Sequence, residues 1–200
     1  EPMYHAMLVR AHEQAKIQRK HVLWFAAEDR PENPAQVAKT PAKLKQRLQR
    51  FLQYHDQQTA EVPGLNLLYE AMHARVTEKL VKNKNIVILK HPPCTVVGWE
   101  LHPADAAGAP GAKGFLTYMP RCIYLQFAGA IWAVDKRLGP GVWPLMPVYR
   151  TWELNAAQGA KIRRHGFTLL PDYASAAFMI QGATLPAAIA DCGDVSDTGG

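Results

Sequence analysis

The sequence has few cysteines and no long apolar run. Its 200 residues include 3 cysteines, Cys94, Cys122 and Cys192, which lie far apart. This odd, sparse set argues against a disulfide scaffold and is typical of a reducing, intracellular compartment, without separating nucleus from mitochondrion. No stretch of about 18 apolar residues occurs, so we expect no transmembrane helix and no membrane partner. Glu1 is not an initiator Met and no secretory leader follows it, so we expect a processed chain or a fragment.

The motifs that mark the common catalytic and metal sites are also missing. No GxxxxGK[ST] phosphate loop, GxGxxG turn, GxSxG elbow or CxxC pair occurs. One close His/Cys pair exists, His91-Pro-Pro-Cys94, but no second pair completes a set of four zinc ligands. We therefore expect no catalytic residue and no metal site in this chain.

The composition is that of a globular protein with a basic surplus. Hydrophobic residues make up 48% and charged residues 20%, enough apolar side chains to build a sizeable core. The formal net charge is +6 at pH 7. Such a surplus suits a nucleic-acid partner, although many proteins carry it without one.

The strongest local signal is a basic helix after Thr40. Thr40 is a good N-cap and Pro41 suits the first helical position. Apolar side chains then recur at helical spacing, at Leu44, Leu48, Phe51 and Leu52. Cations fill the remaining surface, at Lys43, Lys45, Arg47 and Arg50, and no acid occurs between Thr40 and His55. This surface is either a solvated helix face or a track for a phosphate backbone.

The rest of the chain predicts an α/β protein with a β interlude. The first part of the chain predicts a helix over 5–20, with Met7, Leu8, Ala11 and Ala15 near one face, then a strand over 22–26 and a break at 29–34, where two prolines occur. The last part predicts a helix over 173–180 and a strand over 187–191. Between them lie short β-type segments, at 75–77, 86–89, 94–99, 122–127, 148–154 and 167–170, separated by Pro- and Gly-containing linkers. Several short strands at this spacing favour a small barrel or sandwich inserted into an α/β core. We predict a basic turn at 161–165, which either grips phosphates or is a solvated hairpin tip.

Two stretches resemble Pif/RecD-type superfamily 1 DNA helicases. The first is LLYEAMHARVTEKLVKN at 67–83, followed by CTVVGW at 94–99, which looks like the family segment L-x-x-G-x-R-V-x-x-x-x-N…G-x-V-x-G. The second is LLPDYASAAFMIQGATL at 169–185, similar to the family motif that ends in H-K-S-Q-G-x-T-L. Within this group, the two stretches most resemble the divergent helicase-like open reading frames of protists, some of which are related to helitron transposons.

The resemblance implies an α/β fold, part of a RecA-like helicase domain with an inserted small Src-homology-type barrel. Residues 1–66 would begin the second RecA-like domain, 67–165 would form the barrel-like module, and 166–200 would return to the core. It also implies contacts to nucleotide and strand through Gln181, Gly182 and Thr184. From their charge, the candidate phosphate contacts are Lys43, Arg47, Arg50, Lys161, Arg163 and Arg164. Four tryptophans, Trp99, Trp132, Trp143 and Trp152, are either stacking faces for bases or core residues.

Departures from the family pattern limit the implied activity. Phe178-Met179-Ile180 replaces the family's His-Lys-Ser, and the phosphate loop is missing, so ATP and Mg would be bound by the parent helicase only. We expect a carboxy-terminal fragment of an ATP-dependent DNA helicase, with a role in repair or recombination. It would bind single-stranded DNA weakly, pair with the missing motor domain and hydrolyse no ATP alone. One alternative is a non-enzymatic nucleic-acid or protein interaction module from a decayed helicase; another is an unrelated metabolic small-barrel protein.

Overall fold

The computed structural model describes residues 3–38, 40–54, 56–82, 85–106, 114–155 and 160–173. Its helical elements are α1 (Met3–Ile17), α2 (Pro34–Val37), α3 (Pro41–Phe51), the 3-10 turn η1 (Asp56–Thr59) and α4 (Pro103–Ala106). Its strands are β1 (Leu23–Ala26), β2 (Glu28–Pro31), β3 (Leu65–Leu68), β4 (His73–Val76), β5 (Leu80–Lys82), β6 (Ile86–Ile88), β7 (Pro93–Glu100), β8 (Cys122–Gln126), β9 (Val142–Leu145), β10 (Val148–Asn155), β11 (Ala160–Gly166) and β12 (Leu169–Pro171). No helix in these ranges is long and apolar enough to cross a membrane.

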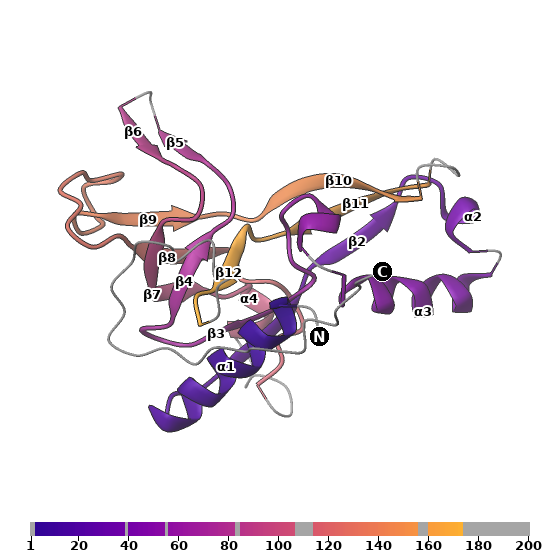
Figure 1. Cartoon of the computed structure of the whole chain (residues 1–200), viewed down its shortest axis with the longest axis horizontal. Helices are drawn as coiled ribbons and strands as arrows, with labels where there is room; N and C mark the ends of the chain where they lie inside the picture. Colours follow the sequence, from indigo (N-terminus) through magenta and orange to yellow (C-terminus); the bar gives the residue numbers. More distant parts are fainter. Residues whose placement is uncertain are drawn as a thin grey trace, which may run out of the picture.

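The larger core lies between α1 and an open five-stranded sheet of order β12-β4-β7-β8-β9 (Figure 1). The apolar face predicted for the first helix is confirmed, because Met7, Leu8, Ala11 and Ala15 are all buried. This face packs toward β3 and β12. Every neighbouring pair in the sheet is antiparallel. Its two edge strands, β12 and β9, do not pair with each other within the described residues, so no closed barrel is seen and the predicted small barrel is not confirmed.

A second, smaller unit is built on the three-stranded sheet β10-β11-β2 (Figure 1). One face of this sheet is covered by α2 and α3, whose side chains meet Trp152 and Ile162 in a separate apolar cluster. The predicted basic helix is confirmed as α3, and the Thr40 side chain accepts a hydrogen bond from the Lys43 N–H at 3.4 Å. The sequence Asp29-Arg-Pro was expected to break the chain, but it forms β2. Pro31 is tolerated there because β2 is an edge strand.

Strand pairing brings early and late parts of the chain together. β2 pairs antiparallel with β11, and β1 pairs antiparallel with β3. The smaller unit therefore joins an early part of the chain to β10 and β11, which lie almost wholly within the predicted β interlude of 67–165 and not in the segment after it. The predicted helix 173–180 and strand 187–191 lie outside the described residues, apart from Tyr173. The domain boundaries at residues 66 and 165 stay predictions.

Candidate nucleic-acid interface

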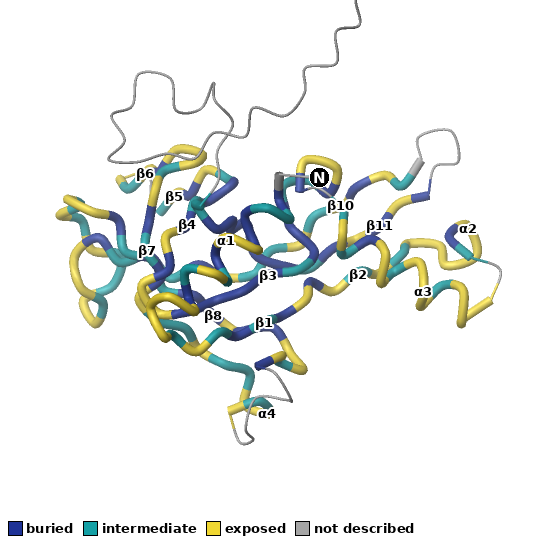
Figure 2. Tube along the Cα trace, turned by 60° about the horizontal axis from the view of Figure 1, so that its bottom comes forward, coloured by how far each residue is buried: buried dark blue, intermediate teal, exposed yellow. Residues whose placement is uncertain are grey.

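The candidate phosphate-binding cations fall into three groups. The helix α3 is largely exposed (Figure 2), and its Lys43, Arg47 and Arg50 are exposed residues. Lys161 and Arg163 are exposed on β11. Arg164 is fully buried. The three residues implied by the helicase motif, Gln181, Gly182 and Thr184, lie outside the described residues.

The outer face of α3 is a surface of cations. Leu44 and Leu48 turn toward the Trp152 cluster, which leaves the charged side chains on the opposite side of the helix. One Arg47 guanidinium N–H donates to the Val37 carbonyl and ties α3 to the end of α2. Lys43 and Arg50 have no ion-pair partner anywhere in the described ranges. The helix therefore presents unneutralised charge to an anionic partner, as an electrostatic track requires.

The segment 161–165 is a strand and not the predicted turn. It lies in the middle of its sheet, between β10 and β2, so both of its edges are hydrogen-bonded. Alternate side chains point to opposite faces of a strand. Ile162 and Arg164 are therefore buried toward the α3 side, while Lys161, Arg163 and His165 face the other way. The cations of α3 and of β11 consequently lie on opposite faces of this sheet.

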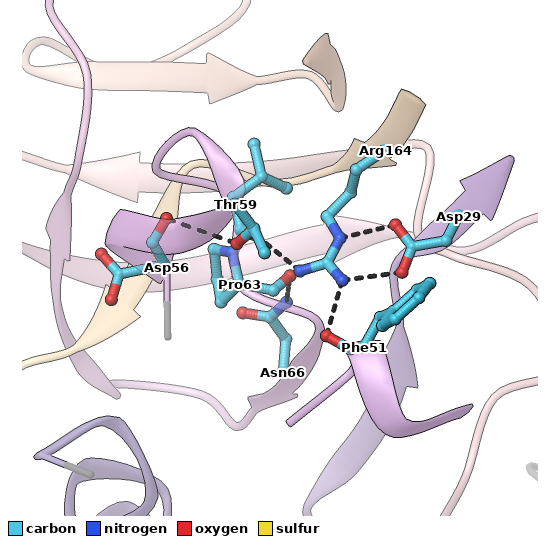
Figure 3. Close-up of polar contacts among 8 residues, drawn as sticks. Asp29, Phe51, Asp56, Thr59, Pro63, Asn66 and Arg164 are labelled. Atoms are coloured by element: carbon cyan, nitrogen blue, oxygen red, sulfur yellow. Dashed lines mark hydrogen bonds and ion pairs between the residues drawn. The ribbon is translucent and has the colours of Figure 1, made fainter. Parts of the chain in front are cut away.

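Arg164 is a structural anchor rather than a phosphate contact. Its Nε and Nη2 donate to the two carboxylate oxygens of Asp29, each at 2.7 Å (Figure 3). The same guanidinium donates to the carbonyls of Val62 at 3.0 Å and Phe51 at 2.8 Å. All of these partners are protein groups and the side chain is 0% exposed. Arg164 thus offers no donor to DNA, and it joins β11 to β2, the end of α3 and the segment before β3.

The exposed face of the smaller sheet carries an aromatic and cationic cluster that the sequence interpretation missed. Tyr149 on β10 lies directly opposite His165 on β11, and their rings stack with centroids 4.1 Å apart and planes 12° apart. The Arg163 guanidinium lies 4.3 Å from the Tyr149 ring centroid. Burial lowers the pKa of His165; the charge of Glu28 opposes this shift, and the charges of Arg30 and Arg163 add to it, so the neutral imidazole is favoured. The one sequence signal for this face is the alternation of side chains along the predicted strand at 148–154, which places every second residue on the same face.

An open pocket of about 350 Å³ adjoins this cluster through His165. Its other lining residues are Glu28, His102, Tyr118, Met119, Pro120, Arg121, Met146 and Pro147. His102 and Tyr118 form a second stacked pair, with ring centroids 4.4 Å apart. The Asp105 carboxylate holds this loop by accepting the backbone N–H groups of Thr117 and Tyr118, at 3.2 and 2.8 Å.

The four tryptophans belong to the packing of the cores. Trp143 and Trp152 are buried, and Trp99 and Trp132 pack against the larger core while remaining partly exposed. Trp152 lies in the smaller cluster, edge-on to Phe51 with ring centroids 5.3 Å apart. The core interpretation of Trp143 and Trp152 is therefore confirmed, because neither has a free ring face to offer a base.

The part of the chain that the structure describes holds no cluster of metal ligands. Cys94 and Cys122 are buried free thiols. Burial raises the pKa of Cys94 to about 12 and that of Cys122 to about 11. The Cys94 thiol also donates to the Ala74 carbonyl, with a sulfur–oxygen distance of 3.3 Å. Protonated, enclosed thiols of this kind are packing residues rather than nucleophiles.

Comparison with known proteins gives a likeness of fold alone. No protein-family model and no curated protein sequence matches the chain. Among solved structures, the crystal structure of Pif1 helicase from Candida albicans is similar over 92% of this chain, with a TM-score of 0.51 and 13% sequence identity. The chain covers 36% of that helicase chain. The α/β fold is therefore helicase-like, and the chain spans about a third of the length of the helicase it matches.

Proposed function

We propose that this chain is the carboxy-terminal part of an ATP-dependent DNA helicase and that it binds the backbone of single-stranded DNA. The observation that carries the proposal is the fold likeness to a helicase over 92% of the chain. A sequence resemblance to superfamily 1 helicases also supports the proposal. Its segments include the whole of β4, β5 and β12, most of β7 and part of β3.

Backbone binding is assigned to α3. Its exposed cations have no acidic neighbour on the helix, so their charge is available to phosphates. Phosphate contacts of this type position a strand without reading its sequence. Catalysis is not assigned to the chain, because phosphoryl transfer needs a phosphate cradle, a metal ion and an arginine finger acting together. ATP and Mg are assigned to the motor domain of the parent protein, which is also the proposed partner.

Charge reversal on α3 tests the proposal. In fluorescence anisotropy with a labelled single strand at low salt, Lys43→Glu combined with Arg47→Glu and Arg50→Glu should weaken binding at least tenfold, for every sequence alike. A matched control reverses three exposed cations outside α3, Lys16, Lys79 and Lys136, and changes net charge by the same amount. If both triple variants bind equally well, α3 is only a solvated face.

The alternative is that the chain is a non-enzymatic interaction module retained from a decayed helicase. Its support is the replacement of the family's His-Lys-Ser by Phe178-Met179-Ile180. A parent chain that binds no single-stranded DNA even at low salt would contradict the helicase proposal. It would favour this module with a protein partner.

A further inference from the structure

We infer that the pocket beside His165 takes one unstacked base of a single DNA strand. This inference rests on the proposed function, because the occupant is the same strand. It adds a base contact on a different surface from α3. The pocket volume of about 350 Å³ lies within the usual range for small-molecule sites, about 300–1,000 Å³.

Two stacked ring pairs contribute to the pocket. Tyr118 is 45% exposed and is stacked on His102, and both residues line the pocket. His165 also lines the pocket and is stacked on Tyr149, which lies next to the pocket and is itself 50% exposed. Exposed aromatic rings fixed by neighbouring rings are already ordered, so a base that stacks there costs little side-chain entropy. Stacking on aromatic side chains is also the usual way in which proteins hold unpaired bases.

The polar groups around the pocket match a nucleotide rather than an apolar ligand. Glu28 lines the pocket and also pairs with Arg30 at 3.3 Å; its carboxylate is an acceptor for an N–H group of an unpaired base, such as N3–H of thymine. Arg121 lines the same pocket and is exposed. Arg163 lies outside the pocket, with its guanidinium over the ring of Tyr149. Both guanidiniums are donors suited to the phosphates on either side of the bound base. The lowered pKa of His165 favours a neutral ring, which stacks without adding charge.

This site and α3 are separated by the smaller sheet. Arg163 and His165 point away from the Trp152 cluster that α3 covers. The two surfaces therefore make separable contributions: α3 supplies backbone attraction that depends on salt, and the pocket supplies stacking that depends on the presence of bases. Variants on one surface leave the other intact.

Thymine and abasic oligonucleotides of equal length test the inference by anisotropy. Both strands carry the same phosphates, so a difference in affinity reports contacts to bases. The intact chain should bind the thymine strand at least roughly fivefold tighter, the lower end of the effect of stacking one base. Tyr118→Ala combined with Tyr149→Ala should remove this preference, whereas Tyr118→Phe should retain it. Phe115→Ala is the control, because Phe115 is a 47% exposed aromatic residue that stacks on Trp24 outside the pocket.

The outcomes separate this inference from the proposed function. Binding of both strands with equal affinity would overturn the pocket and leave the backbone proposal standing. A base preference that survives the double alanine variant would overturn the pocket too. If the intact chain binds neither strand, the proposed function fails and the pocket loses its occupant with it.

Discussion

Replacing Arg164 by Met should be among the most destabilising single changes in this chain. The guanidinium makes two hydrogen bonds of 2.7 Å to Asp29, whose side chain is 2% exposed, and two more to the carbonyls of Phe51 and Val62. Removing one partner leaves a buried carboxylate without compensation. The expected loss in free energy of unfolding is about 3–5 kcal/mol. This is a large share of the roughly 5–15 kcal/mol that stabilises a typical domain.

The measurement is urea denaturation followed by tryptophan fluorescence, since Trp152 lies 5.7 Å from the Arg164 guanidinium. Arg163→Met on the same strand is the matched control. Arg163 is exposed and contributes mainly its contact with Tyr149, so about 0.5–1 kcal/mol is expected. A second variant keeps the test informative if Arg164→Met does not fold. Arg164→Met combined with Asp29→Leu should recover stability, because replacing both partners of a buried pair by apolar groups is often neutral or better.

Two results would refute this reasoning. The first is a loss below about 1 kcal/mol for Arg164→Met, since that is the value of an ordinary exposed pair. The second is an equal loss for Arg163→Met, which would mean that burial of the guanidinium does not set the effect.

Three further predictions concern cysteine, histidine and glycine. Because burial raises the pKa of Cys94 to about 12 and of Cys122 to about 11, both thiols should resist a thiol reagent at pH 8 and react after unfolding; rapid native-state labelling would contradict this. The pKa of His165 is lowered by burial, so its contribution to stability is present above its unfolded value and is lost as pH falls through the folded value; an NMR titration midpoint above about 6.5 would contradict this. A Cβ at Gly64 would lie 2.4 Å from the Leu52 Cα, so Gly64→Ala should cost at least about 1–3 kcal/mol by denaturation. Gly139→Ala, whose Cβ would meet only a Val142 methyl at 3.8 Å, should cost far less, and equal losses would disprove the clash.

Elements set by local sequence were predictable. The helix α3 follows from Thr40, Pro41 and its apolar spacing, because capping and periodicity are properties of neighbouring residues. The strands β7, β8 and β10 were found from β-branched and aromatic runs. Residues 29–31 were misassigned because two prolines nearby suggested a break, whereas an edge position tolerates Pro31.

The site was less predictable because distant pairings build it. Arg164 looks like any surface cation until Asp29, 135 residues away in the sequence, is placed beside it. The same pairing turns the expected basic turn into a central strand and sends its alternate side chains to opposite faces. The pocket collects residues from five separate segments of the chain, which contain Glu28, His102, Arg121, Met146 and His165. No local pattern brings such residues together.

The central claim, that the chain binds the backbone of single-stranded DNA, is tested most directly by the salt dependence of binding. Anisotropy titrations of one labelled strand at several salt concentrations give the slope of log affinity against log salt. Neutralisation of about three to five phosphates predicts a slope of roughly −2 to −3.5. A slope near zero, or no binding at the lowest salt concentration, would contradict the claim.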